Sequence, residues 1–125
     1  MNRLLRRRVD DDGAAAVELA LLLPLLLLIL GGVIDFGFAF NAQISLTHAA
    51  REGVRVEAIG TGDPIAAATA AYQAPGATNF SATVTAACPN AAGAARLRTQ
   101  ATYDFILLPL ATRNLSSEGV MRCNG

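Results

Sequence analysis

The sequence predicts a membrane-anchored α+β protein, in which a long N-terminal transmembrane and stem helix precedes a short helix and a small three-stranded antiparallel sheet. Three observations lead to this fold class. An apolar run extends from Ala14 to Ile34, and a helical repeat of apolar residues continues to about residue 59. After Thr78 the repeat changes to alternation, which is typical of half-buried strands. The 125 residues are enough for one modest domain and an anchor.

The apolar run is long enough to cross a membrane. Ala14 to Ile34 is 21 residues with a single charge, Glu18. As a helix it would be about 31 Å long, against a hydrocarbon core of about 30 Å. Arginines precede the run and none follows it directly, so the positive-inside rule places the N-terminus in the cytoplasm and Asp35 onward outside. Pro24 lies within the run, and we expect a tolerated helix kink there.

A cleaved secretory signal is the main alternative, because it also combines basic residues with an apolar run. Three features disfavour it. Aspartates at positions 10, 11 and 12 interrupt the basic region, no small-x-small cleavage site follows Leu30, and Glu18 lies within the run. The sequence therefore favours a retained anchor.

The stretch "GAAAVE", which begins at Gly13, has a glycine followed by four residues and a glutamate, directly before a leucine-rich helix. It resembles the type IV prepilin processing signal, in which a membrane peptidase cuts after the glycine. The longer stretch "GAAAVELALLLPLLLLILGGVIDFGFAFNAQISLTHAAREGVR" resembles the N-terminal region of TadE-like proteins, and the ending "VMRCNG" resembles their late strand. These are minor pilins or pseudopilins of the tight-adherence (Tad/Flp) pilus system.

The resemblance implies a division of the chain and a set of partners. Residues 1–13 would be a cytoplasmic leader, 14–34 the transmembrane helix, 35–59 an extracytoplasmic stem, and 60–125 a small α/β domain. The cut would fall between Gly13 and Ala14. Expected partners are a prepilin peptidase, other pilin or pseudopilin subunits, the pilus assembly platform and membrane lipid. The expected location is the cytoplasmic (inner) membrane as a single-pass protein, or an extracellular pilus.

Glu18 then has a chemical role. The cut would create an ammonium group at Ala14, about 6 Å along the helix axis from Glu18. Buried charges persist when they are paired. In an assembly, Glu18 of one subunit could pair with the Ala14 amine of its neighbour and set the axial register. The alternative is a glutamate that reaches back to the lipid headgroups.

The stem is predicted to be amphipathic. Its apolar arc is expected to contain Phe36, Phe40, Ile44, Thr47, Val54 and Ala58. His48 and Glu52 lie four residues apart on the other arc, but two ligands are too few for a metal site, and Glu52 is better placed near Arg55. The stem should end at "GTGDP", where Asp63 caps a short helix running from Pro64 to about Ala74.

Three strands follow in the expected order. Alternation predicts one strand after Thr78, from Phe80 to Ala86, and a second from Arg96 to Phe105, which Pro109 ends. A third strand is expected from Gly119 to Cys123. In an antiparallel meander, the ends of the first and third strands meet, which brings Cys88 and Cys123 together. A disulfide is therefore expected after export, with two free thiols or a two-cysteine metal site as alternatives.

Composition and motifs weigh against catalysis and nucleic-acid binding. The chain has one histidine, and it lacks a nucleophile motif and a glycine-rich phosphate loop. Beyond the N-terminus its arginines are scattered among acidic residues, and the net charge is zero. We expect no cofactor, no metal and no enzymatic activity. A pilus structural protein is the leading interpretation, and an unprocessed, bitopic membrane-anchored extracytoplasmic binding module is the alternative.

Overall fold

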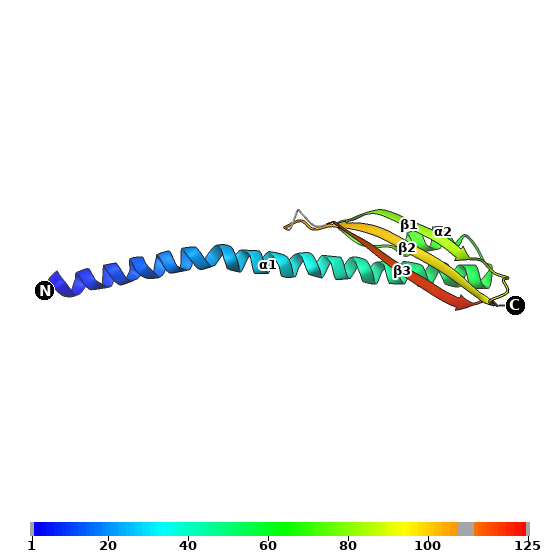
Figure 1. The fold of residues 1–125 in the computed structure, drawn as a ribbon, viewed down its shortest axis with the longest axis horizontal. Coiled ribbons are helices and arrows are strands. Elements are labelled where there is room, and N and C mark those ends of the chain that lie inside the picture. The colour runs from blue at the N-terminus through cyan, green and yellow to red at the C-terminus, as the bar shows by residue number, and fades with distance from the viewer. Residues whose placement is uncertain (1, 108–111, 125) are drawn as a thin grey trace. The chain divides into compact units, whose positions relative to one another are not determined.

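The computed structural model describes residues 2–107 and 112–124, with side chains described from Gly13 onward. The predicted fold class is confirmed (Figure 1). The elements are helix α1 (Asn2–Ile59), helix α2 (Pro64–Ala71) and strands β1 (Ala77–Ala86), β2 (Ala94–Asp104) and β3 (Thr112–Arg122). The chain divides into two compact units, Met1–Ile34 and Asp35–Gly125. Pro109, the predicted end of the second strand, lies outside the described residues.

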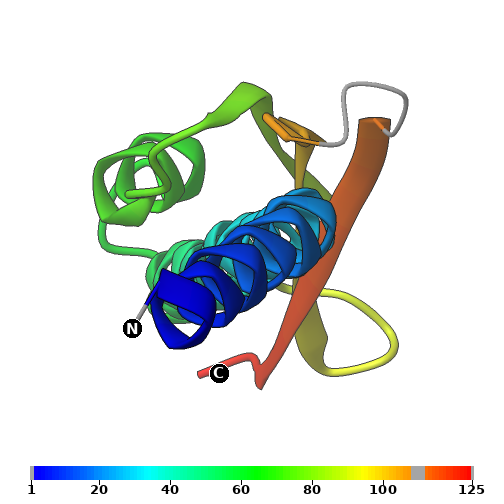
Figure 2. The same cartoon turned by 90° about the vertical axis from the view of Figure 1, so that its left-hand side faces the viewer.

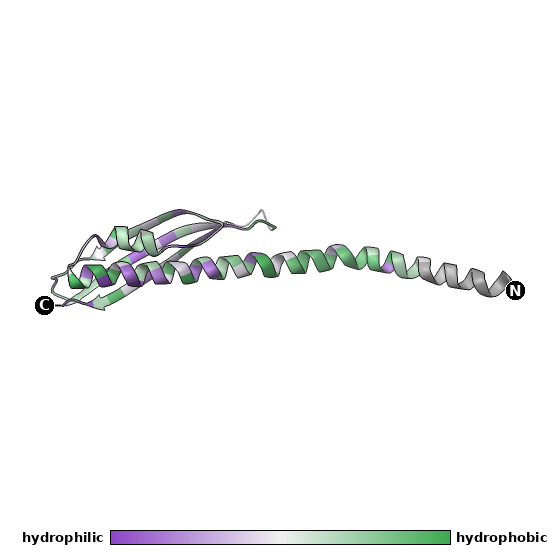
Figure 3. Ribbon diagram, turned by 180° about the vertical axis from the view of Figure 1, so that it is seen from behind, coloured by the Kyte–Doolittle hydropathy of each residue, from purple (hydrophilic) through white to green (hydrophobic). Residues whose placement is uncertain are grey.

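The first unit is a helical segment of α1 whose apolar side chains are almost all exposed. Every leucine from Leu19 to Leu30 is exposed, and Figure 3 shows a mostly hydrophobic stretch here, with a hydrophilic band near its N-terminal end. The helix is long and apolar enough to cross a membrane. Pro24 lies inside α1, and the kink at this residue stays a prediction.

The second unit is built on an antiparallel sheet in the order β1-β2-β3. The central strand β2 pairs with β3 without interruption, from Ala94 opposite Arg122 to Asp104 opposite Thr112. Alternate residues of β2 are buried on one face, which α1 covers, and Figure 2 shows α2 and β3 on opposite sides of α1. The buried residues of β2 are Ala95, Leu97, Thr99, Ala101 and Tyr103.

The face of α1 that packs on the sheet consists mostly of small residues. Ala49, Ala50, Val54 and Ala58 form the core with Ala68 of α2 and with Ala95 and Leu97 of β2. Small side chains let the helix approach closely enough for direct contact with backbone. The hydroxyl of Thr99 donates to the carbonyl oxygen of Leu46 at 2.9 Å, which satisfies a buried polar group across the interface.

Gly119 in β3 shows how close this approach is. A Cβ atom at Gly119 would lie 2.5 Å from the carbonyl oxygen of Ala50 and 2.9 Å from Cγ1 of Val54. Gly53 in α1 is equally confined, because its Cβ would lie 2.8 Å from the carbonyl oxygen of Pro64. The backbones of α1 and β3 therefore meet at Gly119, and those of α1 and α2 come close at Gly53.

The predicted apolar arc of the stem is wrong in its first half. Phe36, Phe40 and Ile44 are exposed by 54%, 67% and 59%. The packed face instead runs through Ala42, Leu46 and the alanines that follow. Small residues fill most of this face because helix and sheet approach closely there, down to backbone contact at Gly119. Phe36, Phe40 and Ile44 lie outside this close contact and stay largely exposed.

Two element boundaries also differ from expectation. β3 begins at Thr112 and not at Gly119. Its first seven residues are polar except for Leu115, so this edge strand shows no alternation from which its start could be predicted. α2 ends at Ala71, and Tyr72 after it is extended. The predicted cap is confirmed: Oδ1 of Asp63 accepts hydrogen bonds from the N–H groups of Ile65 and Ala66, at 2.9 and 3.2 Å.

A disulfide joins Cys88, which follows β1, to Cys123, which follows β3, with their Cα atoms 5.7 Å apart. The end of α1 is tied to the same place. A carboxylate oxygen of Glu57 accepts from the N–H of Cys88 at 3.0 Å. The N–H of Asn124 donates to the carbonyl oxygen of Ala58 at 3.1 Å.

Candidate processing and assembly site

The predicted processing residues lie on an uninterrupted part of α1. Gly13, Ala14 and Glu18 are helical and exposed. A Cβ atom at Gly13 would meet no heavy atom within 4 Å. Because glycine within a helix costs about 1 kcal/mol relative to alanine, and packing does not require it here, the described fold gives no reason for glycine at this position.

Glu18 is a carboxylate on an otherwise apolar surface. It is exposed, as are the valine and leucine on either side of it. Among the side chains described from Gly13 onward, no cation lies within ion-pairing distance of Glu18; the ion pairs found there are Glu52 with Arg55 and Glu118 with Arg96. A carboxylate at such a position needs a partner or contact with water when the helix enters lipid.

His48 and Glu52 do not form a metal site with other residues. Glu52 pairs with Arg55 at 3.7 Å, as the spacing suggested, and His48 is exposed. Across the described part of the chain, no three histidine, cysteine, aspartate or glutamate side chains gather in a way that could hold a metal ion.

A buried carboxylate at the start of the second unit was missed by sequence reasoning. Asp35 is fully buried, and its two oxygens accept hydrogen bonds from the N–H groups of Ile106 and Leu107 at 3.2 and 2.8 Å. A lone aspartate after an apolar run is ordinarily solvated, and the residues that bind it lie 71 and 72 positions away. The sequence carried no local signal for this contact.

Aromatic rings surround this contact. Phe105 meets Phe36 edge to face at a centroid distance of 5.7 Å and meets Tyr103 at 5.2 Å. Burial raises the pKa of the Tyr103 phenol, and the nearby charge of Asp35 raises it further. The Tyr103 hydroxyl is buried without a hydrogen-bond partner among the described residues.

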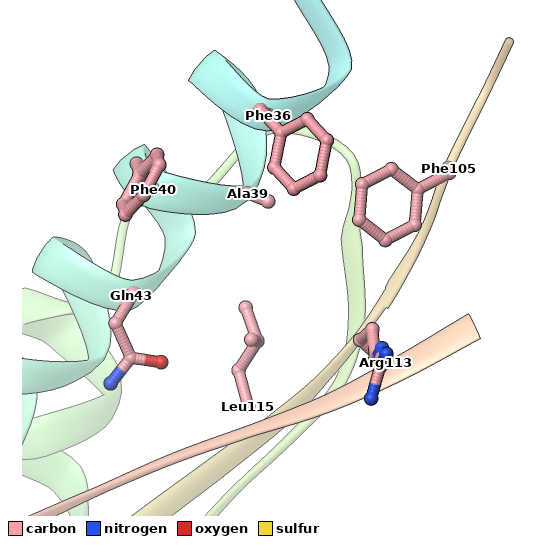
Figure 4. Close-up of a pocket in the computed structure, with 7 residues that line it drawn as sticks. All are labelled: Phe36, Ala39, Phe40, Gln43, Phe105, Arg113 and Leu115. Atoms are coloured by element: carbon pink, nitrogen blue, oxygen red, sulfur yellow. The ribbon is translucent and has the colours of Figure 1, made fainter. Parts of the chain in front are cut away.

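A groove of about 360 Å³ opens beside these rings (Figure 4). Figure 4 shows Phe36 and Phe105 facing each other, with Arg113 next to Phe105 and with Gln43 on α1. The remaining lining residues are Ala39, Phe40 and Leu115. The lining is apolar except for Gln43, whose amide donates to the carbonyl oxygen of Ser116 at 3.0 Å, and Arg113. The groove lacks the cluster of titratable groups that catalysis needs.

Comparison with known proteins gives one match, in the N-terminal part of the chain. Residues 13–55 match the family model of TadE-like proteins. Over these residues the chain is similar to TadE-like proteins. This match confirms the resemblance seen in the sequence, and it begins at Gly13. No curated protein and no solved structure gives a significant match to the chain.

The TadE-like match covers the exposed apolar helix and most of the stem, and it leaves the sheet unmatched. TadE-like proteins are structural components of the Tad pilus and are not known as enzymes. Together with the apolar helix, the match indicates a Tad pilus-associated protein with an N-terminal membrane anchor. It also implies association with the Tad machinery and other pilins.

Proposed function

We propose that the protein is a minor pilin or pseudopilin of a Tad/Flp pilus, made as a single-pass precursor and cut by a prepilin peptidase between Gly13 and Ala14. The leader would face the cytoplasm, and the sheet would lie outside the cytoplasmic membrane. The observation that carries the proposal is the TadE-like match, which starts at Gly13 and extends over a helix with exposed apolar side chains.

Two features of α1 support processing and assembly. Gly13 has open space around it, so the packing of the fold does not require a glycine there. A residue without a side chain does suit an enzyme that must approach the backbone. Glu18 has no described cationic partner within the chain, and the cut would supply one in the form of the Ala14 ammonium of a neighbouring subunit. Pairing between subunits would satisfy the carboxylate in lipid and fix the axial stagger of the helices.

Processing is tested by substituting Gly13 and sequencing the N-terminus by mass spectrometry. In cells with an active prepilin peptidase, the native chain should begin at Ala14, and Gly13→Ala should retain Met1. Gly32→Ala is the matched control, because Gly32 is on the same helix and a Cβ there also meets nothing within 4 Å. Native protein that still begins at Met1 would instead favour an unprocessed, membrane-anchored binding module.

Assembly is tested separately with Glu18→Gln, which keeps the shape of the side chain and removes its charge. We expect normal insertion and cleavage but loss of the protein's incorporation into, or priming of, the pilus. Val17→Ala is a control at an exposed neighbouring position. Wild-type pilus formation by Glu18→Gln would contradict the proposed pairing with the Ala14 amine while leaving cleavage unaffected.

A further inference from the structure

The second unit carries an exposed apolar patch at one end. We define the tip patch as Phe36 and Phe40 of α1 with Ile106 and Leu107, which follow β2. Their exposed fractions are 54%, 67%, 68% and 54%. Phe36 and Phe40 both line the groove of Figure 4, and Phe105, next to Ile106 in the chain, contacts Phe36. An apolar cluster of this kind on an exposed surface usually marks a binding site.

Asp35 holds two residues of the tip patch close to the end of the apolar run. Its carboxylate binds the backbone N–H groups of both Ile106 and Leu107. Asp35 directly follows Ile34, the last residue of the apolar run. The backbone of Ile106 and Leu107 is therefore held within hydrogen-bonding distance of Asp35, the first residue after the predicted membrane span. Hydrogen bonds to a buried carboxylate are among the stronger ones, so this position is well defined.

The chemistry of the patch suits the boundary between lipid and water. Phenylalanine and leucine side chains enter the region between headgroups and acyl chains readily, and basic side chains remain at the headgroups. Arg113 is a basic side chain of this kind: it lies on the groove wall next to Phe105 in Figure 4, and it is exposed. Farther along the sheet, the outward-facing residues of β2 are polar and include Arg96 and Arg98.

We propose that the tip patch is a second membrane contact: Ile106, Leu107, Phe36 and Phe40 insert among the lipid headgroups of the membrane that the N-terminal helix spans, with Arg113 at the phosphate level. The partner is the lipid surface, to which the patch is adjacent through Asp35. This contact does not depend on cleavage at Gly13, because the precursor and the cut chain both keep the apolar run. It would orient the sheet at the membrane before any assembly.

The chain contains no tryptophan, so a single introduced tryptophan reports the depth of one position. The full-length Leu107→Trp variant is reconstituted in phosphatidylcholine vesicles that contain phosphatidylglycerol, with bromine on the acyl chains either near the headgroup or deep in the bilayer. We expect loss of emission with the shallow bromine and a smaller loss with the deep one. Leu28→Trp, in the middle of the apolar run, should be quenched more by the deep bromine.

Val120→Trp is the matched control outside the patch, because Val120 is also an exposed apolar residue and lies near the other end of β3. It should keep its emission in both kinds of vesicle. Ile106→Trp provides a second reporter, and the Cys88–Cys123 disulfide, checked by mass, shows that each variant has folded.

Unquenched emission from both patch reporters, with Leu28→Trp quenched, would overturn the lipid contact and leave the anchor in place. A blue-shifted emission at Leu107→Trp that bromine does not affect would point to a protein partner, such as a second copy or another pilin, and would overturn it as well. If Leu28→Trp is not quenched, the anchor itself is wrong, and the proposal fails with it.

Discussion

Glycines in the two units of the chain have opposite surroundings. In the first unit, Gly13 and Gly32 are surrounded by open space. In the second, Gly119 allows the backbones of α1 and β3 to touch, and Gly53 allows the backbone of α2 to come close to α1. These two glycines are explained by contacts within the chain. No contact among the described residues explains Gly13 and Gly32, so we look for their explanation in other molecules: lipid, a peptidase or neighbouring helices.

The largest difference between the two units is expected when the disulfide is removed. The bridge closes a loop with a sequence separation of 35, and in the chain-entropy model such a loop contributes about 4 kcal/mol. The variant with Cys88→Ala and Cys123→Ala should therefore lose much of the stability of the second unit, measured by thermal unfolding in detergent micelles. Membrane insertion of the first unit should be unchanged. If membrane insertion fell together with stability, the first unit would depend on the second, and the contrast between the two units would not hold.

A smaller effect is expected from adding one methyl group at a confined glycine. Gly119→Ala places a Cβ against the backbone of Ala50, which cannot move as a side-chain end can. Overpacking of this kind costs about 1–3 kcal/mol. Gly32→Ala, where the space is open, should leave the Tm unchanged or raise it slightly, because alanine is the better helix former. A Tm for Gly119→Ala equal to wild type would show that α1 is not held against β3 as closely as described.

The smallest effect concerns the Tyr103 phenol and appears only in alkali. Its pKa is raised from the ordinary value of 10.0, so the unfolded chain loses this proton at a lower pH than the folded one. The resulting stability is fully present below pH 10, and it is lost as the pH rises through the raised pKa. Tyr72, whose pKa is also raised by burial, adds to the same slope.

Tyr103→Phe should therefore reduce the decline in stability between about pH 9 and about pH 11, measured by urea unfolding. At neutral pH it should be neutral or slightly stabilising, because the hydroxyl is buried without a partner among the described residues. An unchanged alkaline slope would assign the decline to other groups and would contradict the burial of Tyr103.

The sequence predicted those elements whose side chains repeat with a regular period. Alternation in "FSATVTA" and "RLRTQATYD" located β1 and β2. The start of β3 was missed because an edge strand needs no apolar face. The first half of the packed side of α1 was missed because alanine is a weak hydrophobic signal, whereas Val54 and Ala58 were placed correctly. Asp35 could not have been recognised locally, since its partners are distant in the chain. Gly13 and Glu18 were noticed only because their spacing resembles a known processing signal.

The link between the end of α1 and the cysteines has a mechanical meaning. Glu57 holds Cys88, and Ala58 holds the residue after Cys123, by hydrogen bonds of 3.0 and 3.1 Å. Because the two cysteines are joined covalently, both attachments hold α1 to one cross-linked piece of chain. Pulling the end of α1 away from that piece has to break both hydrogen bonds, while the covalent bridge keeps the ends of β1 and β3 together.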